Sequence, residues 1–131
     1  METSVGAPRK RHVLIVDDDI ELAWTFKATL ERCGYEATIV PDGALALRFA
    51  LEHRLDAVVC DLQMARLEGD LLYATVERSD PTLARRFVFI AGGTACPPLR
   101  KFMEAAHLPV LQKPVAIESL LSEVVRVAEQ Q

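Results

Sequence analysis

The sequence lacks the features that would place it in a membrane or outside the cell. Within its 131 residues no apolar run is long enough to cross a bilayer. The opening segment, METSVGAPRK, has no apolar core of the kind found in signal peptides. The three cysteines are scattered without a C-x-x-C pair, which is typical of reduced thiols and argues against a metal site built from them. These absences predict a cytoplasmic protein with no membrane partner.

The sequence also lacks an excess of positive charge. Its net charge is -4, which gives no reason to expect direct nucleic-acid binding. The one basic cluster, Arg9 to Arg11, is interpreted as a solvated lead-in, and a nucleic-acid arm is the less favoured alternative. Residues 1–11 are therefore expected to form a flexible tail. The remaining length suits one domain with a real core.

Apolar runs alternate with segments of helical periodicity, and neither internal repeats nor low-complexity segments interrupt them. The strands are predicted at His12–Val16, Glu36–Val40, Ala57–Cys60, Phe87–Ala91 and Val110–Leu111. The helices are predicted at Ile20–Cys33, Ala44–His53, from a cap at Asp70 to about Arg78, Pro97–His107 and Ile117–Val127. Asp80 and Pro81 are expected to break the third helix. Strands without alternating polarity indicate a parallel sheet covered on both faces, which is a doubly wound α/β fold.

Charged residues follow the predicted strands. Asp17 and Asp18 end the first strand, Asp61 ends the third, and Lys113 follows the fifth. In doubly wound sheets ligands bind beyond the carboxyl ends of the strands, so these side chains are expected to converge there. Carboxylates suit Mg²⁺ or Mn²⁺, and a lysine can hold a phosphoryl oxygen. Taken singly, each residue fits a helix cap or turn equally well, and Asp19 is interpreted as only the cap of the first helix.

Three motifs together resemble the response-regulator receiver domain of two-component signalling. They are VLIVDDD at 13–19, DLQM at 61–64 with Gly69 after it, and Lys113-Pro114. The resemblance runs from about His12 to Val127, and the domain is placed at residues 12–129. It implies a flavodoxin-like (βα)5 fold whose five parallel strands are ordered 2-1-3-4-5.

The resemblance also implies roles for these residues. Asp61 is the expected phosphoacceptor, and Lys113 is expected to contact the phosphoryl oxygens. Mg²⁺, or Mn²⁺ in its place, is expected to be bound by Asp18, by Asp17 through water, by Asp61 and by the backbone carbonyl of Gln63. The Lys113-Pro114 bond is expected to be cis. Such a domain catalyses its own phosphorylation and dephosphorylation without being a conventional turnover enzyme.

The partners that the resemblance implies are proteins. The phosphoryl donor is expected to be a histidine kinase or a phosphotransfer domain. A kinase or effector domain covalently linked to this chain, outside the present sequence, is a further expectation. Trp24, on the solvent side of the first predicted helix, is a candidate anchor for docking the donor, and the competing interpretation is that its ring folds down against the surface.

The sequence departs from the family at the switch positions. Ala91 stands where the family usually has Ser or Thr, and Val110 where it often has Tyr or Phe. Ala65 replaces the proline common after the phosphoacceptor, and Thr94 is poorly placed to supply the missing hydroxyl. These losses leave the nucleophile, the metal ligands and the lysine in place. We therefore expect phosphorylation with an atypical output.

Three alternatives remain open. A non-phosphorylated pseudo-receiver that acts as an interaction module is favoured by Ala91 and Val110. A haloacid-dehalogenase-like phosphatase would need a second acid two residues after its nucleophile, where this sequence has Gln63. A flavodoxin-like nucleotide binder would need a Gly-rich fingerprint after the first strand, and none is present.

Overall fold

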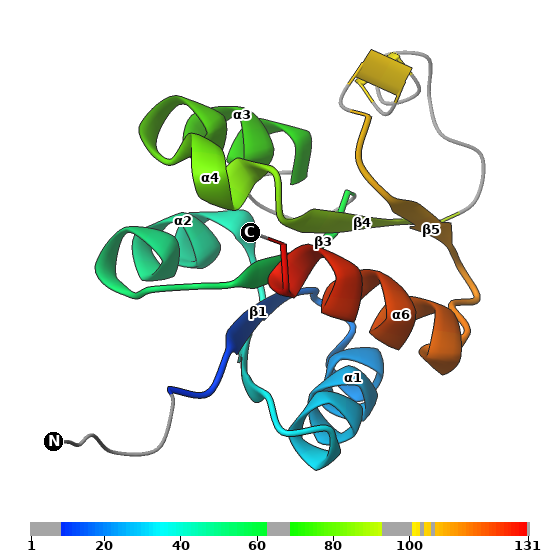
Figure 1. Ribbon diagram of the computed structural model, residues 1–131. Helices are drawn as coiled ribbons and strands as arrows, with labels where there is room; N and C mark the ends of the chain where they lie inside the picture. Colours follow the sequence, from blue (N-terminus) through cyan, green and yellow to red (C-terminus); the bar gives the residue numbers. More distant parts are fainter. Residues whose placement is uncertain (1–8, 63–68, 93–100, 103, 106, 131) are drawn as a thin grey trace, which may run out of the picture.

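Five parallel strands form one sheet in the order β2-β1-β3-β4-β5, as predicted (Figure 1). The computed structural model describes residues 9–62, 69–92, 101–102, 104–105 and 107–130. The strands are β1 (His12–Val16), β2 (Glu36–Val40), β3 (Ala57–Asp61), β4 (Phe87–Ala91) and β5 (Val110–Gln112). Every residue of β1, β3 and β4 is buried, which explains why these strands read as continuous apolar runs.

Helices cover both faces of the sheet (Figure 1). One face packs on α1 (Ile20–Arg32) and α6 (Ile117–Ala128), around Phe26 and Val124. The other face packs on α2 (Gly43–Glu52), α3 (Gly69–Ser79) and α4 (Pro81–Ala84), around Leu72 and Phe89. The fold is thus the doubly wound arrangement that the alternation of patterns predicts.

Helix boundaries follow the capping residues. Asp19 accepts a hydrogen bond from the Leu22 amide at 3.2 Å, and Asp42 accepts one from the Leu45 amide at 2.9 Å. Asp19 thus acts as the N-cap expected of it, and Asp42 caps α2 in the same way. The prediction for the third helix was wrong in detail, because α3 begins at Gly69 and Asp70 lies inside it.

The sequence prediction missed α4. Asp80 and Pro81 were expected only to break the third helix, but they also start a short one. The Asp80 carboxylate accepts a hydrogen bond from the Leu83 amide at 3.2 Å, and Pro81 occupies the first helical turn. An N-cap aspartate followed by proline is a helix start as well as a helix stop, so the signal was present.

The helix predicted at Pro97–His107 falls largely outside the described residues. Residues 101–102 and 104–105 are helical, and Phe102 packs against Tyr73 and Phe89. His107 is not helical and has a positive φ of 54°. No helix in the described part of the chain has the length and hydropathy needed to cross a membrane.

Candidate phosphoacceptor site

The carboxyl ends of β1 and β3 bring three aspartates together. Val16 pairs with Cys60 in the sheet, so Asp17 and Asp61 occupy the next step of the same register. One carboxylate oxygen from each of Asp17, Asp18 and Asp61 lies within 4.8 Å of the others. Asp17 and Asp61 are buried, whereas Asp18 is exposed. The strand-end convergence predicted from the sequence is therefore present.

Lys113 completes the cluster from the far side of β4. Its backbone amide donates to the Ala91 carbonyl at 2.9 Å, which fixes the start of the segment after β5. Its Nζ donates to Asp61 Oδ2 at 3.1 Å. The Lys113-Pro114 peptide bond is cis, the form that the resemblance implies. Four charged side chains from three strand ends thus meet at one edge of the sheet.

Asp17 is the member of the cluster with a buried oxygen that lacks a described hydrogen-bond donor. Its Oδ1 accepts a hydrogen bond from the Asp19 amide at 2.9 Å. Its Oδ2 is buried and accepts no hydrogen bond from any residue that the structure describes. A buried carboxylate oxygen without a donor is costly, so this atom calls for a cation or an ordered water.

The electrostatics follow from this packing. Burial raises the pKa of Asp17 to about 6, helped by the charge of Asp61 and opposed by the hydrogen bond from the Asp19 amide. Burial alone would lower the pKa of Lys113, but its hydrogen bond to Asp61 and the charges of Asp61 and Asp17 outweigh burial and raise it. Lys113 is therefore positively charged at neutral pH, and its single charge only partly neutralises Asp17 and Asp61.

This donor set fits a hard divalent cation. Carboxylate oxygens are the ligands that Mg²⁺ and Mn²⁺ prefer, and Asp17 Oδ2 is a buried acceptor that still needs a positive partner. Gln63, whose carbonyl was expected to be a further ligand, lies outside the described residues, as do Ala65 and Thr94. Among the described residues, Asp17, Asp18 and Asp61 are thus the ones that could hold such a cation.

The substituted switch positions lie beside the site. Ala91 is buried at the end of β4, where its methyl group supplies no hydrogen-bond donor. Val110 pairs with Phe89 and is half-buried against the same core as Ala91. Both positions are packed with small apolar side chains, so neither carries a polar group toward Asp61.

Trp24 lies on the outer face of α1, with 57% of its surface exposed. Ile20, one helical turn earlier, is 49% exposed. The Lys27 ammonium lies 6.0 Å from the centre of the Trp24 ring. Trp24 and Ile20 thus form an exposed apolar pair on the helix that starts directly after the acidic cluster.

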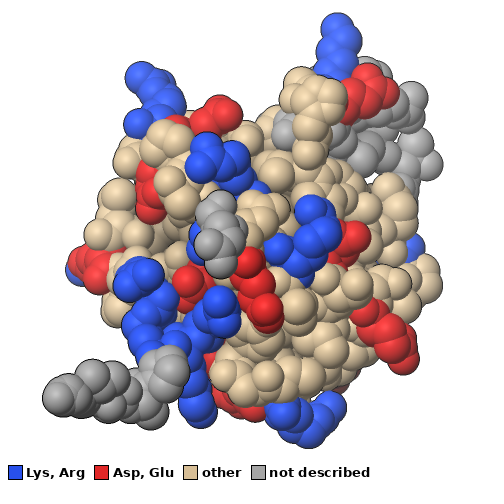
Figure 2. Space-filling view, in the orientation of Figure 1, with Lys and Arg blue, Asp and Glu red and all other residues tan. Residues whose placement is uncertain are grey.

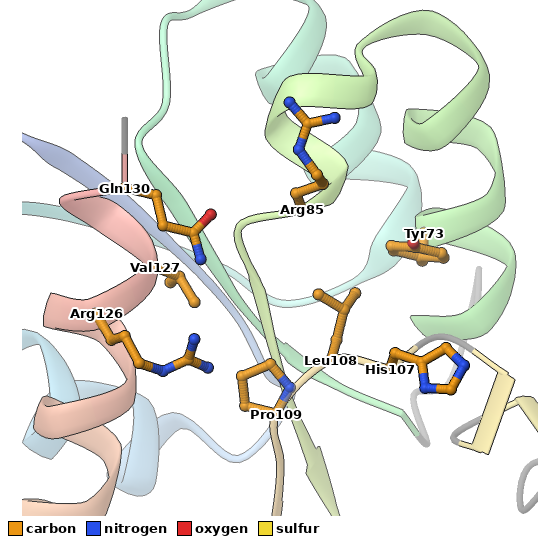
Figure 3. A pocket seen from close by; sticks show the side chains of 8 residues that line it. All are labelled: Tyr73, Arg85, His107, Leu108, Pro109, Arg126, Val127 and Gln130. Carbon is orange, nitrogen blue, oxygen red and sulfur yellow. The ribbon is translucent and has the colours of Figure 1, made fainter.

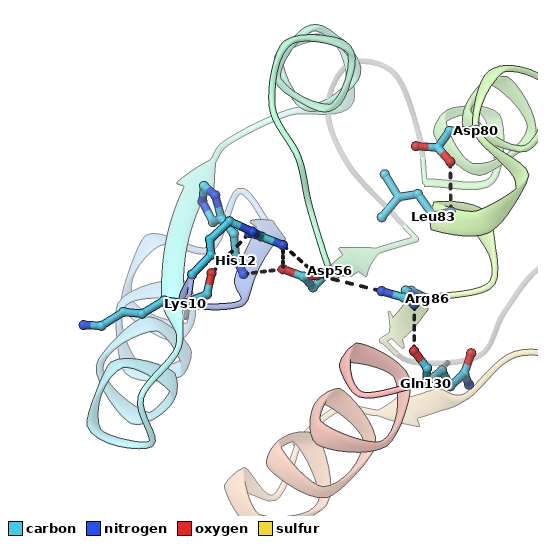
Figure 4. A network of polar contacts seen from close by, with 8 residues as sticks. Lys10, His12, Asp56, Asp80, Leu83, Arg86 and Gln130 are labelled. Carbon is cyan, nitrogen blue, oxygen red and sulfur yellow. Dashed lines mark hydrogen bonds and ion pairs between the residues drawn. The ribbon is translucent and has the colours of Figure 1, made fainter. Parts of the chain in front are cut away.

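The opposite edge of the sheet holds a second polar cluster, which the sequence prediction missed (Figure 4). Arg9 donates to both Asp56 oxygens at 3.1 and 3.0 Å, and the His12 amide donates to Oδ2 at 2.8 Å. Arg86 lies 3.8 Å from Asp56 and donates to the Gln130 carbonyl at 2.8 Å. Arg9 is exposed, as expected of a solvated lead-in, but it is also paired with a buried carboxylate, which the sequence interpretation did not include. No local pattern predicts a pair 47 residues apart.

A hollow of about 290 Å³ also opens at that edge (Figure 3). Its base includes Leu108 and Pro109, and Arg126 extends toward Pro109, whereas Arg85 extends away from both. Arg126 is already paired with Glu123 at 2.8 Å. The two guanidinium groups do not converge, so the described residues that line the hollow do not form an anion site. On the face in Figure 2, basic and acidic side chains are interspersed.

Comparison with known proteins agrees with the site. The sequence model of the response regulator receiver domain matches residues 13–125. The transcriptional regulatory protein PrrA of Mycobacterium tuberculosis is 44% identical over 69 residues, which cover 53% of this chain and 28% of that protein. The response regulator receiver protein Anae109_2439 of Anaeromyxobacter is 33% identical over 111 residues, which cover 85% of this chain and 46% of that protein. The chain thus spans less than half the length of these relatives.

Solved structures give the same answer for the fold. A CheY-like receiver domain protein from Methanospirillum hungatei superposes with a TM-score of 0.83 at 23% identity, covering 92% of this chain and 95% of that one. The chemotaxis protein CheY4 of Vibrio cholerae superposes with a TM-score of 0.75 at 26% identity, covering 91% of this chain and 99% of that one. Together with the family match, these findings favour the receiver over the phosphatase and the nucleotide binder. This chain belongs to the response regulator receiver domain family of two-component systems.

Proposed function

We propose that Asp61 accepts a phosphoryl group from a histidine kinase or phosphotransfer domain in an Mg²⁺-dependent reaction. The observation that carries the proposal is the pairing of Asp61 with Lys113 at 3.1 Å beside a buried carboxylate oxygen that has no donor among the described residues. The reaction would take place in the cytoplasm. The domain would span residues 12–129, and Arg9, which precedes it, would be attached to it through the pair with Asp56.

The chemistry follows from the charges. A carboxylate oxygen of Asp61 forms a bond to phosphorus while the phosphorus–nitrogen bond of the donor histidine breaks, and that nitrogen keeps the electron pair. Lys113 is placed to neutralise a phosphoryl oxygen as it approaches Asp61. Asp17, Asp18 and Asp61 would hold Mg²⁺, which would supply the rest of the positive charge. Asp17 and Lys113 thus prepare the site without forming a covalent bond themselves.

The test is incubation with acetyl phosphate and Mg²⁺, followed by intact mass. We expect a single phosphate adduct that is lost in Asp61→Asn and lost without Mg²⁺. Asp19→Asn is the matched control, because asparagine caps a helix as well as aspartate does and the adduct should survive. No adduct on the wild-type chain would instead favour the pseudo-receiver alternative.

The output of this domain is proposed to be atypical. Ala91 has no hydroxyl to bind the phosphoryl group, and Val110 has no ring to reorient. Amide chemical shifts with and without a phosphoryl mimic test this, and we expect changes confined to the neighbourhood of Asp61. Ala91→Thr should extend the changes toward residues 107–127. Large changes across that segment in the wild-type chain would contradict weak coupling.

Docking of the donor is proposed to use Trp24. An exposed Trp next to an exposed Ile, one turn beyond the acidic cluster, offers an apolar anchor close to the reacting group. Trp24→Ala should slow transfer from a histidine kinase that phosphorylates the wild-type chain, and leave the acetyl phosphate reaction unchanged. Leu51→Ala, on the exposed face of α2, is the control and should change neither rate. Equal slowing of both reactions would argue against docking.

A further inference from the structure

His12 occupies an unusual position at the edge of the sheet remote from Asp61. It is the first residue of β1, is 8% exposed, and lies between β2 and α2. Its ring nitrogen Nε2 lies 2.8 Å from the Thr38 hydroxyl of β2. Its ring also packs edge-on against Phe49 of α2, with centroids 5.6 Å apart. One buried imidazole therefore ties a strand and a helix together.

The last turn of α2 contains the phenylalanine that makes this contact. Phe49 stacks on His53 at 3.9 Å, and a ring nitrogen of His53 lies 3.1 Å from the Phe49 carbonyl. Leu51 and Glu52, between them in sequence, are exposed. Phe49 and Ala50 thus pack this turn against the core, and Phe49 also contacts the His12 ring of β1.

The site offers little compensation for a positive charge on His12. Asp56 is close, but its oxygens already accept hydrogen bonds from Arg9 and from the His12 amide, and Arg86 lies beside them. Glu36 of β2 favours the charged imidazole, while His53 of α2 and Arg9 oppose it. Burial is the largest effect, and the pKa of His12 is lowered from its ordinary value.

We propose that His12 acts as an acid-sensitive clasp, which holds the last turn of α2 on the sheet while its imidazole is neutral and releases it on protonation. The sign follows from linkage, because a proton that binds the open state better than the closed one favours opening. The closed turn is fully stable above the ordinary histidine pKa of about 6.5 and loses stability as the pH falls below it.

Amide hydrogen exchange of residues 49–53, divided by the intrinsic exchange rate, tests the proposal. Between about pH 7 and about pH 5.5, opening should increase by up to about eightfold if only the open state takes the proton. The amides of β3 and β4 should show no such increase in opening between these pH values. His12→Gln, which keeps a polar group for Thr38 and cannot titrate, should remove the pH dependence.

Two matched variants sharpen the result. His107→Gln removes a distant exposed histidine, and His53→Gln removes the neighbouring one, and both should keep the pH dependence. Dependence that persists in His12→Gln, or that disappears in His53→Gln alone, would overturn the assignment. If His12→Gln does not fold, the ring resonances of the wild-type chain decide, since a His12 that titrates at or above the ordinary value refutes the clasp.

Discussion

A buried aspartate lies at each edge of this sheet, and the two are held in opposite ways. Asp56 accepts hydrogen bonds from Arg9 and the His12 amide and lies beside Arg86, so its charge is compensated within the chain. Asp17 lies beside Asp18 and Asp61, and one of its oxygens finds no donor among the described residues. The same residue type thus stabilises the fold at one edge and carries an electrostatic cost at the other. The proposed cation would offset that cost at the edge that carries Asp17.

The largest expected effect is at the compensated edge. Asp56→Ala removes the partner of Arg9 and leaves the half-buried Arg86 without its carboxylate. We expect a loss of about 3 kcal/mol in the free energy of unfolding, measured by urea denaturation. Glu52→Ala, which removes an exposed carboxylate paired with Arg48, is the control and should cost under about 1 kcal/mol. If both variants lost the same free energy of unfolding, the buried Asp56 cluster would stabilise the fold no more than an exposed ion pair does.

The opposite sign is expected at the acidic edge. A pKa of about 6 for Asp17 means that its ionisation opposes folding, by up to about 3 kcal/mol at neutral pH. The protonated Asp17 carboxyl therefore stabilises the folded state at acidic pH, and this contribution is lost as the pH rises through about 6. Without metal, Asp17→Asn should therefore be more stable than the wild-type chain at neutral pH, and the difference should shrink at about pH 5. A destabilised Asp17→Asn at neutral pH would show that the carboxylate is compensated after all.

Added Mg²⁺ should offset the cost at Asp17. At a concentration ten times its dissociation constant, a ligand that binds only the folded state stabilises it by about 1.4 kcal/mol. We expect a higher melting temperature for the wild-type chain and a much smaller rise for Asp18→Asn. Asp56→Asn, at the far edge, should keep the full rise if it folds. If the Mg²⁺ response disappeared in Asp56→Asn, the cation would bind near Asp56, and the proposed site at Asp17, Asp18 and Asp61 would be contradicted.

The smallest expected effect concerns the lead-in. Arg9 is 42% exposed, so its pair with Asp56 is partly screened by solvent. Arg9→Ala should lower the free energy of unfolding by about 1 kcal/mol, whereas Lys10→Ala should change it little. Urea denaturation of the two variants side by side measures this. If the two variants had the same free energy of unfolding, the pair with Asp56 would not stabilise the fold, and residues 9–11 would behave as the flexible tail predicted from the sequence.

The two edges also differ in how far the sequence reveals them. Strands β1, β2 and β4 have the predicted bounds, because buried parallel strands carry an uninterrupted apolar run. The acidic edge was predictable because topology gathers strand ends at one place, so Asp17, Asp61 and Lys113 could be placed together without a structure. The pairing of Arg9 with Asp56 was not predictable, because no local pattern specifies a contact between residues so far apart. The missing donor at Asp17 Oδ2 likewise depends on side-chain packing.

The central claim is that a cation held at the acidic edge makes Asp61 reactive. An Mg²⁺ titration followed by amide chemical shifts of the wild-type chain tests it most directly. We predict saturable shifts concentrated at Asp17, Asp18, Asp61 and Lys113, with no change around Asp56. Shifts that never saturate, or that gather around Asp56, would contradict the account.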